Sequence, residues 1–260
     1  MRTRWLLLPV ALLALSAMAP EPITLFLAGD STMAQKLVSR RPETGWGEAL
    51  QQYFDVDQVR VVNLARNGRS TKSFITEGRW EALLGEVKPG DYVFIQFGHN
   101  DEKRNKPAVY ADPHTDYPRN LDRFVRDVRA RGGHPVLLTP VARRKFAADG
   151  TVEDTHGAYP DAVRAVARRD SVPLVDMQQR STEVLARCGE AGSRLLYNQL
   201  EPGQNPNYPQ GVHDDTHFSP LGAQVMASLA VQGVRDAVPD LARYLDPHAP
   251  RAPALPAACR

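Results

Sequence analysis

The sequence predicts an α/β protein, a three-layer α/β/α sandwich around a mainly parallel, doubly wound sheet of five strands. Five short apolar runs rich in Val, Ile, Leu and Phe lack clean alternation, which is typical of strands covered on both faces. Helical patterns separate these runs, and repeated strand-helix-strand units wind into such a sandwich. No internal repeat or break in composition divides the 260 residues into two domains.

The expected strands are residues 23–28, 59–65, 92–97, 135–139 and 173–177. Among the helices, residues 120–131 place Leu121, Phe124 and Val128 on one face and arginines on the other. Residues 158–168 repeat this pattern. The last helix is expected to begin at Ser219-Pro220, because serine caps helices and proline suits the first helical position.

The two ends of the chain are expected to lie outside this domain. Residues 1–19 have a charged start, a short apolar run and a small-x-small end, the pattern of a secretory signal peptide; an uncleaved membrane anchor is the alternative. Cleavage after Ala19 removes Arg2 and Arg4 and lowers the formal net charge from +2 to zero, so the basic pI does not indicate nucleic acid. We expect a secreted or periplasmic protein without a nucleic-acid partner and without stable membrane association after cleavage.

The Pro- and Ala-rich residues 247–260 predict an unpacked tail, which leaves residues 20–246 as the domain. Cys188 and Cys259 are not at a metal-site spacing. They can pair in an oxidising compartment, although such a disulfide would only fix the tail. The sequence leaves this pairing open.

Chemistry-bearing residues follow the expected strands, where ligands bind in open α/β sheets. Gly29-Asp30-Ser31 ends the first strand and enters helix-compatible residues, so Ser31 is either a helix cap or a nucleophile. Gly68 follows the second strand and Gly98-His99-Asn100-Asp101 the third, where each can also serve in a turn or cap. Together they can supply amide donors to a shared crevice.

The segment before the last helix contains a candidate base. Asp214 precedes His217 by three residues, a spacing at which a carboxylate in a turn can hold Nδ1 of the imidazole and leave Nε2 free to take a serine proton. Asp215 is an alternative partner for His217, and His213 fits a structural role. Nucleophile, amide donors and base are the parts that acyl transfer requires.

These blocks, in order, resemble the four sequence blocks of the GDSL or SGNH hydrolase superfamily, whose flavodoxin-like fold agrees with the predicted sandwich. The resemblance covers about residues 23–223. Asp30-Ser31-Thr32-Met33-Ala34 in place of a GDSL tetrad is similar to the rhamnogalacturonan acetylesterase branch. The resemblance implies a serine esterase that removes O-acetyl groups from an acetylated polysaccharide or oligosaccharide, without a metal or cofactor.

The resemblance also implies roles for single residues. Ser31 would be the nucleophile, His217 the base and Asp214 its orienting acid, while the amides of Ser31 and Gly68 and the side chain of Asn100 would form the oxyanion hole. We further expect His99, Arg69 and Tyr208 to contact the substrate, with packing and turn roles as alternatives. Four basic residues can contact uronate groups of the substrate or, as the alternative, form a solvated rim: Arg66, Arg143, Arg144 and Lys145. Tyr197 can stack on sugar rings.

Three other functions stay open. The first is an esterase of different specificity, acting on xylan, lipid or a thioester. The second is a metal-dependent phosphoesterase with Asp30, His99, Asn100, Asp214 and His217 as ligands, although the His-Asn order is exchanged relative to that family's block. The third is a non-catalytic carbohydrate-binding relative, which a fold alone does not exclude.

Overall fold

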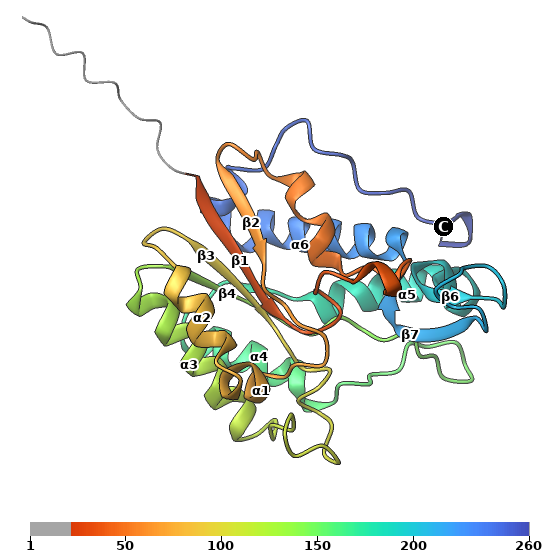
Figure 1. Ribbon diagram of the computed structural model, residues 1–260, viewed down its shortest axis with the longest axis horizontal. Helices are drawn as coiled ribbons and strands as arrows, with labels where there is room; N and C mark the ends of the chain where they lie inside the picture. The colour runs from red at the N-terminus through yellow and green to blue at the C-terminus, as the bar shows by residue number, and fades with distance from the viewer. Residues whose placement is uncertain (1–21, 260) are drawn as a thin grey trace, which may run out of the picture.

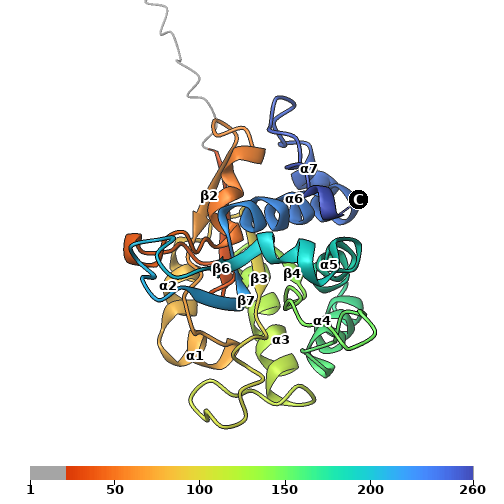
Figure 2. The same cartoon turned by 90° about the vertical axis from the view of Figure 1, so that its right-hand side faces the viewer.

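The computed structural model describes residues 22–259, which form a five-stranded parallel sheet between two layers of helices (Figures 1 and 2). The sheet has the order β2-β1-β3-β4-β5. Its strands are β1 (Ile23–Gly29), β2 (Val59–Asn63), β3 (Tyr92–Gln96), β4 (His134–Leu138) and β5 (Leu174–Val175). The predicted fold class and all five predicted strands are confirmed, and no strand end differs from its predicted position by more than two residues.

The strands are apolar on both faces because each face contributes to a different core. Along β1, Leu25 and Leu27 enter one hydrophobic core, whereas Phe26 and Ala28 enter the other. The core that contains Phe26 and Ala28 is closed by the helices between residues 71 and 169. The core that contains Leu25 and Leu27 is closed by the short turns after β1 and by the long helices at 177–193 and 220–237. This double burial explains why the strands lack the alternation of a half-exposed sheet.

The helices fill the two outer layers (Figure 1). The predicted helices at 120–131 and 158–168 are confirmed, and Ser219 Oγ accepts a hydrogen bond from Gly222 N as the predicted cap. The α-helices are α1 (Thr71–Thr76), α2 (Arg79–Glu86), α3 (Asp116–Ala130), α4 (Ala158–Arg169), α5 (Met177–Ser193), α6 (Pro220–Ala237) and α7 (Pro239–Ala242). No helix in residues 22–259 has the length and apolarity needed to span a membrane.

A separate antiparallel hairpin, β6 (Tyr197–Leu200) and β7 (Val212–Phe218), lies beside the carboxyl ends of the main strands. The sheet changes direction at β1, since β2 lies on one side of it and β3 on the other. The carboxyl ends of β1, β2 and β3 are therefore neighbours, and this is the position at which doubly wound sheets bind ligands.

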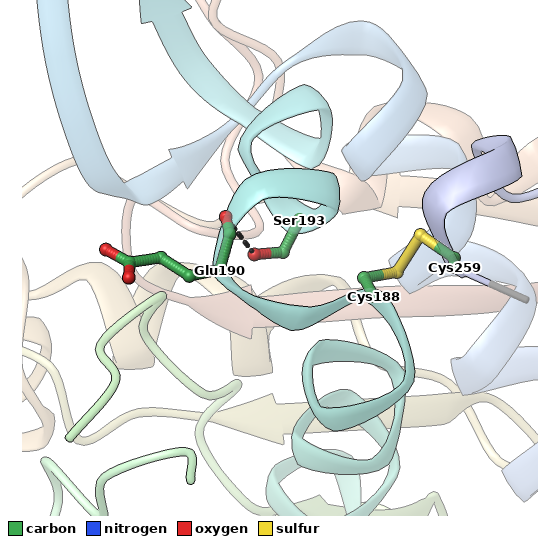
Figure 3. The surroundings of a disulfide bond; sticks show 4 residues. All are labelled: Cys188, Glu190, Ser193 and Cys259. Atoms are coloured by element: carbon green, nitrogen blue, oxygen red, sulfur yellow. Dashed lines mark hydrogen bonds between the residues drawn. A yellow bond between two sulfur atoms is a disulfide. The ribbon is translucent and has the colours of Figure 1, made fainter. Parts of the chain in front are cut away.

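The C-terminal segment is not the unpacked tail that the sequence predicts. Cys259 is fully buried and forms a disulfide with Cys188 of α5 (Figure 3). Ala249 and Leu255 also pack against the core. Apolar contacts and a disulfide thus fix the C-terminal segment to the domain, although its Pro- and Ala-rich composition is typical of an unpacked tail. The predicted signal peptide at 1–19 lies outside the described residues.

Candidate active site

Ser31 lies in a tight turn directly after β1. The buried Asp30 side chain accepts hydrogen bonds from Thr32 N at 2.9 Å and Thr32 Oγ1 at 2.8 Å, and the Asp30 carbonyl accepts from Met33 N and Ala34 N. Burial raises the pKa of Asp30 and outweighs these hydrogen bonds. No α-helix begins at Ser31, so the helix start that the sequence indicates is wrong: the apolar Met33 and Ala34 are buried within the turn.

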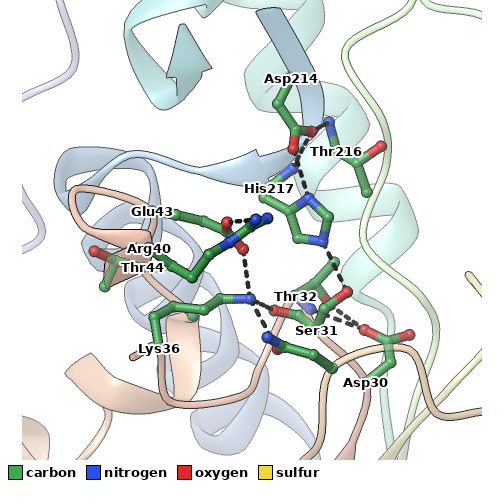
Figure 4. A network of polar contacts seen from close by, with 12 residues as sticks. Asp30, Ser31, Thr32, Lys36, Arg40, Glu43, Thr44, Asp214, Thr216 and His217 are labelled. Carbon is green, nitrogen blue, oxygen red and sulfur yellow. Dashed lines mark hydrogen bonds and ion pairs between the residues drawn. The ribbon is translucent and has the colours of Figure 1, made fainter. Parts of the chain in front are cut away.

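A chain of hydrogen bonds joins Ser31 to His217 and Asp214 (Figure 4). His217 Nε2 lies 2.8 Å from Ser31 Oγ, and His217 Nδ1 lies 2.7 Å from Asp214 Oδ2. Because a carboxylate can only accept, Nδ1 carries the hydrogen and Nε2 is free to accept the hydroxyl proton of Ser31. This is the arrangement of nucleophile, base and orienting acid that the sequence predicts.

Asp214 is fixed as an ionised acceptor. Its Oδ1 accepts from the backbone amides of Thr216 at 2.8 Å and His217 at 2.9 Å. Burial acts to raise the pKa of Asp214, but the hydrogen bonds from His217 and these amides outweigh it and lower that pKa. The alternative acid, Asp215, instead accepts from Arg144 Nη1 at 2.8 Å and Gln199 Nε2 at 2.7 Å.

A bulge in β7 brings Asp214 and His217 together. Tyr197 pairs with Phe218, yet the next residue, Asn198, pairs with Asp214, so the three residues between Asp214 and Phe218 bulge out of the ladder. Side chains three apart in a regular strand point to opposite faces. The irregularity lets the Asp214 carboxylate reach Nδ1 of His217 while Nε2 of the same ring meets Ser31 Oγ, and bulges next to active sites commonly re-aim side chains in this way.

Three candidate amide donors stand in the segments that follow β1, β2 and β3. Within residues 22–259, neither Ser31 N nor Gly68 N donates a hydrogen bond, and both remain available to an oxyanion. Gly68 has a φ of +76°, a conformation that favours glycine. Asn100 Nδ2 donates one hydrogen to the Arg69 carbonyl at 2.9 Å, and this hydrogen bond holds the side chain against the Gly68 loop. The second hydrogen of the NH₂ group remains available to another acceptor.

Asn100 is oriented from its other side by a lysine that the sequence did not suggest. Lys103 Nζ lies 2.6 Å from Asn100 Oδ1. An ammonium can only donate, so the oxygen must face Lys103 and the NH₂ group must face the Gly68 loop. Burial lowers the pKa of Lys103.

Asp101, the last residue of this block, anchors it to α1. Asp101 Oδ1 accepts from Thr71 N at 2.9 Å and from Thr71 Oγ1, whereas its buried Oδ2 has no partner among the described residues. Burial raises the pKa of Asp101 to about 7. The residue holds the loop after β3 at the start of the neighbouring helix.

The three residues that we expect to contact the substrate differ in their burial and in their partners. His99 is 3% exposed and its ring packs edge-on against His156; burial lowers the pKa of His99 well below the usual range. Arg69 is half-buried and pairs with Glu77. Tyr208 is half-buried and donates to the Arg40 carbonyl, which ties its loop to the segment after Ser31.

One other expectation about the substrate groove does not agree with the structure, and the contact of the basic residues with uronates stays a prediction. Tyr197 is buried and donates to the Ala142 carbonyl, so it does not present a ring for sugar stacking. Arg143 and Arg144 pair with Glu102 and Asp215, while Arg66 is exposed. As for the metal alternative, no three His, Cys, Asp or Glu side chains within residues 22–259 are grouped so that they could hold a metal ion.

Comparison with known proteins identifies a family and named relatives. Residues 27–225 match the model of the GDSL-like lipase/acylhydrolase family. The chain is 39% identical to the rhamnogalacturonan acetylesterase RhgT of Bacillus subtilis, over 84% of this chain and 92% of that protein. It is 35% identical to the probable rhamnogalacturonan acetylesterase YesY of the same organism, over 82% of this chain and 92% of that protein.

The fold has a close counterpart among solved structures. The crystal structure of YxiM from Bacillus subtilis superposes with a TM-score of 0.71 at 26% identity, covering 83% of this chain and 56% of that one. The sandwich and the sequence blocks on its strand ends thus point to the same group of proteins.

Proposed function

The chain belongs to the GDSL-like lipase/acylhydrolase family and is a carboxylic ester hydrolase; from this premise we propose a secreted or periplasmic carbohydrate acetylesterase. Its proposed substrate is an O-acetylated plant cell-wall polysaccharide, rhamnogalacturonan or pectin. The observation that carries the proposal is the unbroken hydrogen-bonded series Ser31, His217, Asp214. The names of the two similar Bacillus proteins support the substrate class.

The proposed reaction has two steps. Ser31 Oγ attacks the acetyl carbon while its proton passes to His217 Nε2, and Asp214 stabilises the imidazolium that forms. The carbonyl oxygen becomes an oxyanion that accepts from Ser31 N, Gly68 N and Asn100 Nδ2. When the intermediate collapses, the C–O bond to the sugar breaks and His217 returns the proton to the leaving sugar oxygen.

Water then completes the cycle. A water molecule gives a proton to His217 and attacks the acetyl group on Ser31, and collapse of the second intermediate releases acetate and returns the proton to Ser31 Oγ. This route uses only groups of the chain and water.

The decisive test is acetate release from acetylated rhamnogalacturonan or pectin, acetylated xylan and short acyl esters, with wild type and Ser31→Ala compared. We expect release from the pectic substrate and none with Ser31→Ala. Preference for xylan, lipid or thioester would assign another specificity. No release from any substrate would indicate a non-catalytic relative, whereas activity that survives Ser31→Ala and is lost with a chelator would indicate metal chemistry.

Localisation is tested separately. The full chain is expressed in a bacterial host, and the exported protein is examined by intact-mass spectrometry. Cleavage after Ala19 predicts a mature chain that begins at Pro20. A protein of full mass in the membrane fraction would instead support the anchor.

A further inference from the structure

The ammonium group of Lys36 is buried beside the nucleophile. Its side chain has no exposed surface, and Nζ lies 2.5 Å from the Ser31 carbonyl oxygen, 3.1 Å from Asn67 Oδ1 and 2.7 Å from Glu43 Oε1 (Figure 4). An ammonium has three hydrogens, so each oxygen can accept one of them. Lys36 is thus fully satisfied and has no hydrogen left for a substrate.

Two of these partners belong to the two backbone segments that supply oxyanion amides. Ser31 is in the turn after β1, and Asn67 immediately precedes Gly68 in the loop after β2. A backbone bond from Arg66 N to the Gly29 carbonyl joins the same segments at the strand ends. Further from the sheet, next to Ser31 and Gly68, Lys36 connects the turn after β1 to the loop after β2.

The charge of Lys36 is balanced by Glu43, which is only 2% exposed. Burial acts to raise the pKa of Glu43, but the hydrogen bond and charge of Lys36 outweigh it, and that pKa is lowered. Arg40 and Tyr208 contact the other oxygen of the same carboxylate. The pair therefore acts as a fixed bridge more than as a free positive charge beside the substrate.

We infer that Lys36 is a positioning residue that sets the separation of the Ser31 and Gly68 amides, and that this separation determines how well they stabilise the oxyanion. Donors preorganised toward developing charge contribute strongly to catalysis, and their contribution depends on position. The inference rests on the proposed esterase function. It adds a side chain that touches neither the substrate nor the catalytic histidine.

The test combines hydrolysis of para-nitrophenyl acetate with inhibition by methylboronic acid. In the inhibited state Ser31 Oγ adds to boron, its proton passes to His217, and boron becomes a tetrahedral anion like the intermediate of acetyl transfer. Affinity for this probe therefore reports the oxyanion site. Rates are expressed per folded protein, measured by size-exclusion chromatography and circular dichroism.

Two variants remove the bridge in different ways. Lys36→Met combined with Glu43→Gln removes the ammonium without leaving a buried carboxylate unpaired. Asn67→Ala removes one acceptor from an exposed position and leaves the buried pair intact. Lys88→Met, which removes an exposed lysine before the amino-terminal end of β3 and so away from the site, is the matched control.

We expect the double variant to lose about 10- to 100-fold in kcat with KM within about threefold, and the inhibition constant of methylboronic acid to rise by a similar factor. Asn67→Ala should change both quantities in the same direction by a smaller factor, and Lys88→Met should change neither. A purely structural role would lower the folded fraction but leave the inhibition constant per folded molecule unchanged.

The possible failures are distinguishable. Wild-type kcat and inhibition constant in folded Asn67→Ala would overturn the inference, even if the double variant did not fold. Unchanged values in the double variant would do the same. A wild-type protein that hydrolyses no acetyl ester would overturn the proposed function instead.

Discussion

His217 Nε2 lies 2.8 Å from Ser31 Oγ although the two residues are 186 positions apart in the chain. Ser31 follows the central strand β1, and His217 is on the bulged strand β7 of the separate hairpin. The proposed nucleophile therefore depends on the main sheet and the proposed base on the hairpin. Activity requires that the two parts of the structure pack together correctly.

Asp214→Asn should reduce kcat on the order of 10⁴-fold, because an amide does not stabilise the imidazolium and favours the wrong tautomer of His217. The measurement is steady-state hydrolysis of para-nitrophenyl acetate. Asp215→Asn is the matched control. Because Asp215 binds Arg144 and Gln199 and not His217, the kcat of this variant should stay within about twofold of wild type. Equal losses in both variants would contradict the assignment of Asp214 as the orienting acid.

Asn100→Ala should reduce kcat by about 10²- to 10³-fold, or about 3 kcal/mol of transition-state stabilisation, with a smaller change in KM. The side chain is held by Arg69 and Lys103, so its amide is aligned before substrate binds. Thermal unfolding of the variant checks that the fold is retained. Asn105→Ala, on the exposed loop that follows, should behave as wild type. Near-wild-type turnover of folded Asn100→Ala would remove this residue from the proposed oxyanion hole.

Much of the fold was predictable because the strands are buried on both faces, and continuous apolarity is visible in sequence. The hairpin was not: Val212–Phe218 is mainly polar, and its pairing with Tyr197–Leu200 depends on a bulge that no local pattern reveals. Ser31, Asn100 and His217 were predictable as residue types at strand ends or before a helix cap.

The supporting residues of the site could not be predicted in this way. Lys36 and Lys103 look like surface lysines in sequence, and only tertiary packing shows that one is buried and that the other meets Asn100. Likewise, the composition of residues 247–260 is that of a loose tail, and nothing local indicates that Cys259 reaches α5. Long-range contacts decide these positions.

Arg69→Gln should raise KM for an acetylated acidic oligosaccharide several-fold and should lower kcat for para-nitrophenyl acetate by a smaller factor, because Arg69 Nη1 also donates to the Asn67 carbonyl beside Gly68 N. Arg69 follows Gly68, and its guanidinium could exchange Glu77 for a uronate carboxylate, since both are bound by the same charge-assisted hydrogen bonds. Arg79 also binds Glu77 but lies on α2, so Arg79→Gln is the matched control. An unchanged KM for the acidic substrate in Arg69→Gln would exclude this residue as a substrate contact.

Cys259→Ser should lower the free energy of unfolding by about 2–4 kcal/mol, because the disulfide to Cys188 spans 71 positions and restricts the unfolded chain. Urea unfolding with and without a reductant measures the difference. Within residues 22–259, Ser31, Asp214 and His217 form no hydrogen bond with α5, so kcat should not change. A reductant that leaves wild-type unfolding unchanged would show that the disulfide does not contribute to stability.

Asp101→Asn should weaken the pH dependence of stability. Burial raises the pKa of Asp101 from 3.8 to about 7, so between these values the folded protein holds a proton that the unfolded chain has lost. Stability that Asp101 contributes is therefore present at about pH 4 and is lost as the pH rises toward 7, with a slope of at most about 1.4 kcal/mol per pH unit. The raised pKa of Asp30 acts in the same direction, which is why the slope should weaken and not vanish.

The measurement is urea unfolding of wild type and Asp101→Asn at pH 5 and pH 8. An asparagine oxygen can still accept from Thr71, and the amide has no proton to lose and so gains no buried charge. Relative to wild type, the variant should therefore be more stable at pH 8 than it is at pH 5. The exposed Asp57→Asn serves as control and should show no such gain. The same difference between Asp101→Asn and wild type at both pH values would mean that Asp101 is ionised throughout this range and that its buried charge is tolerated by the surrounding dipoles.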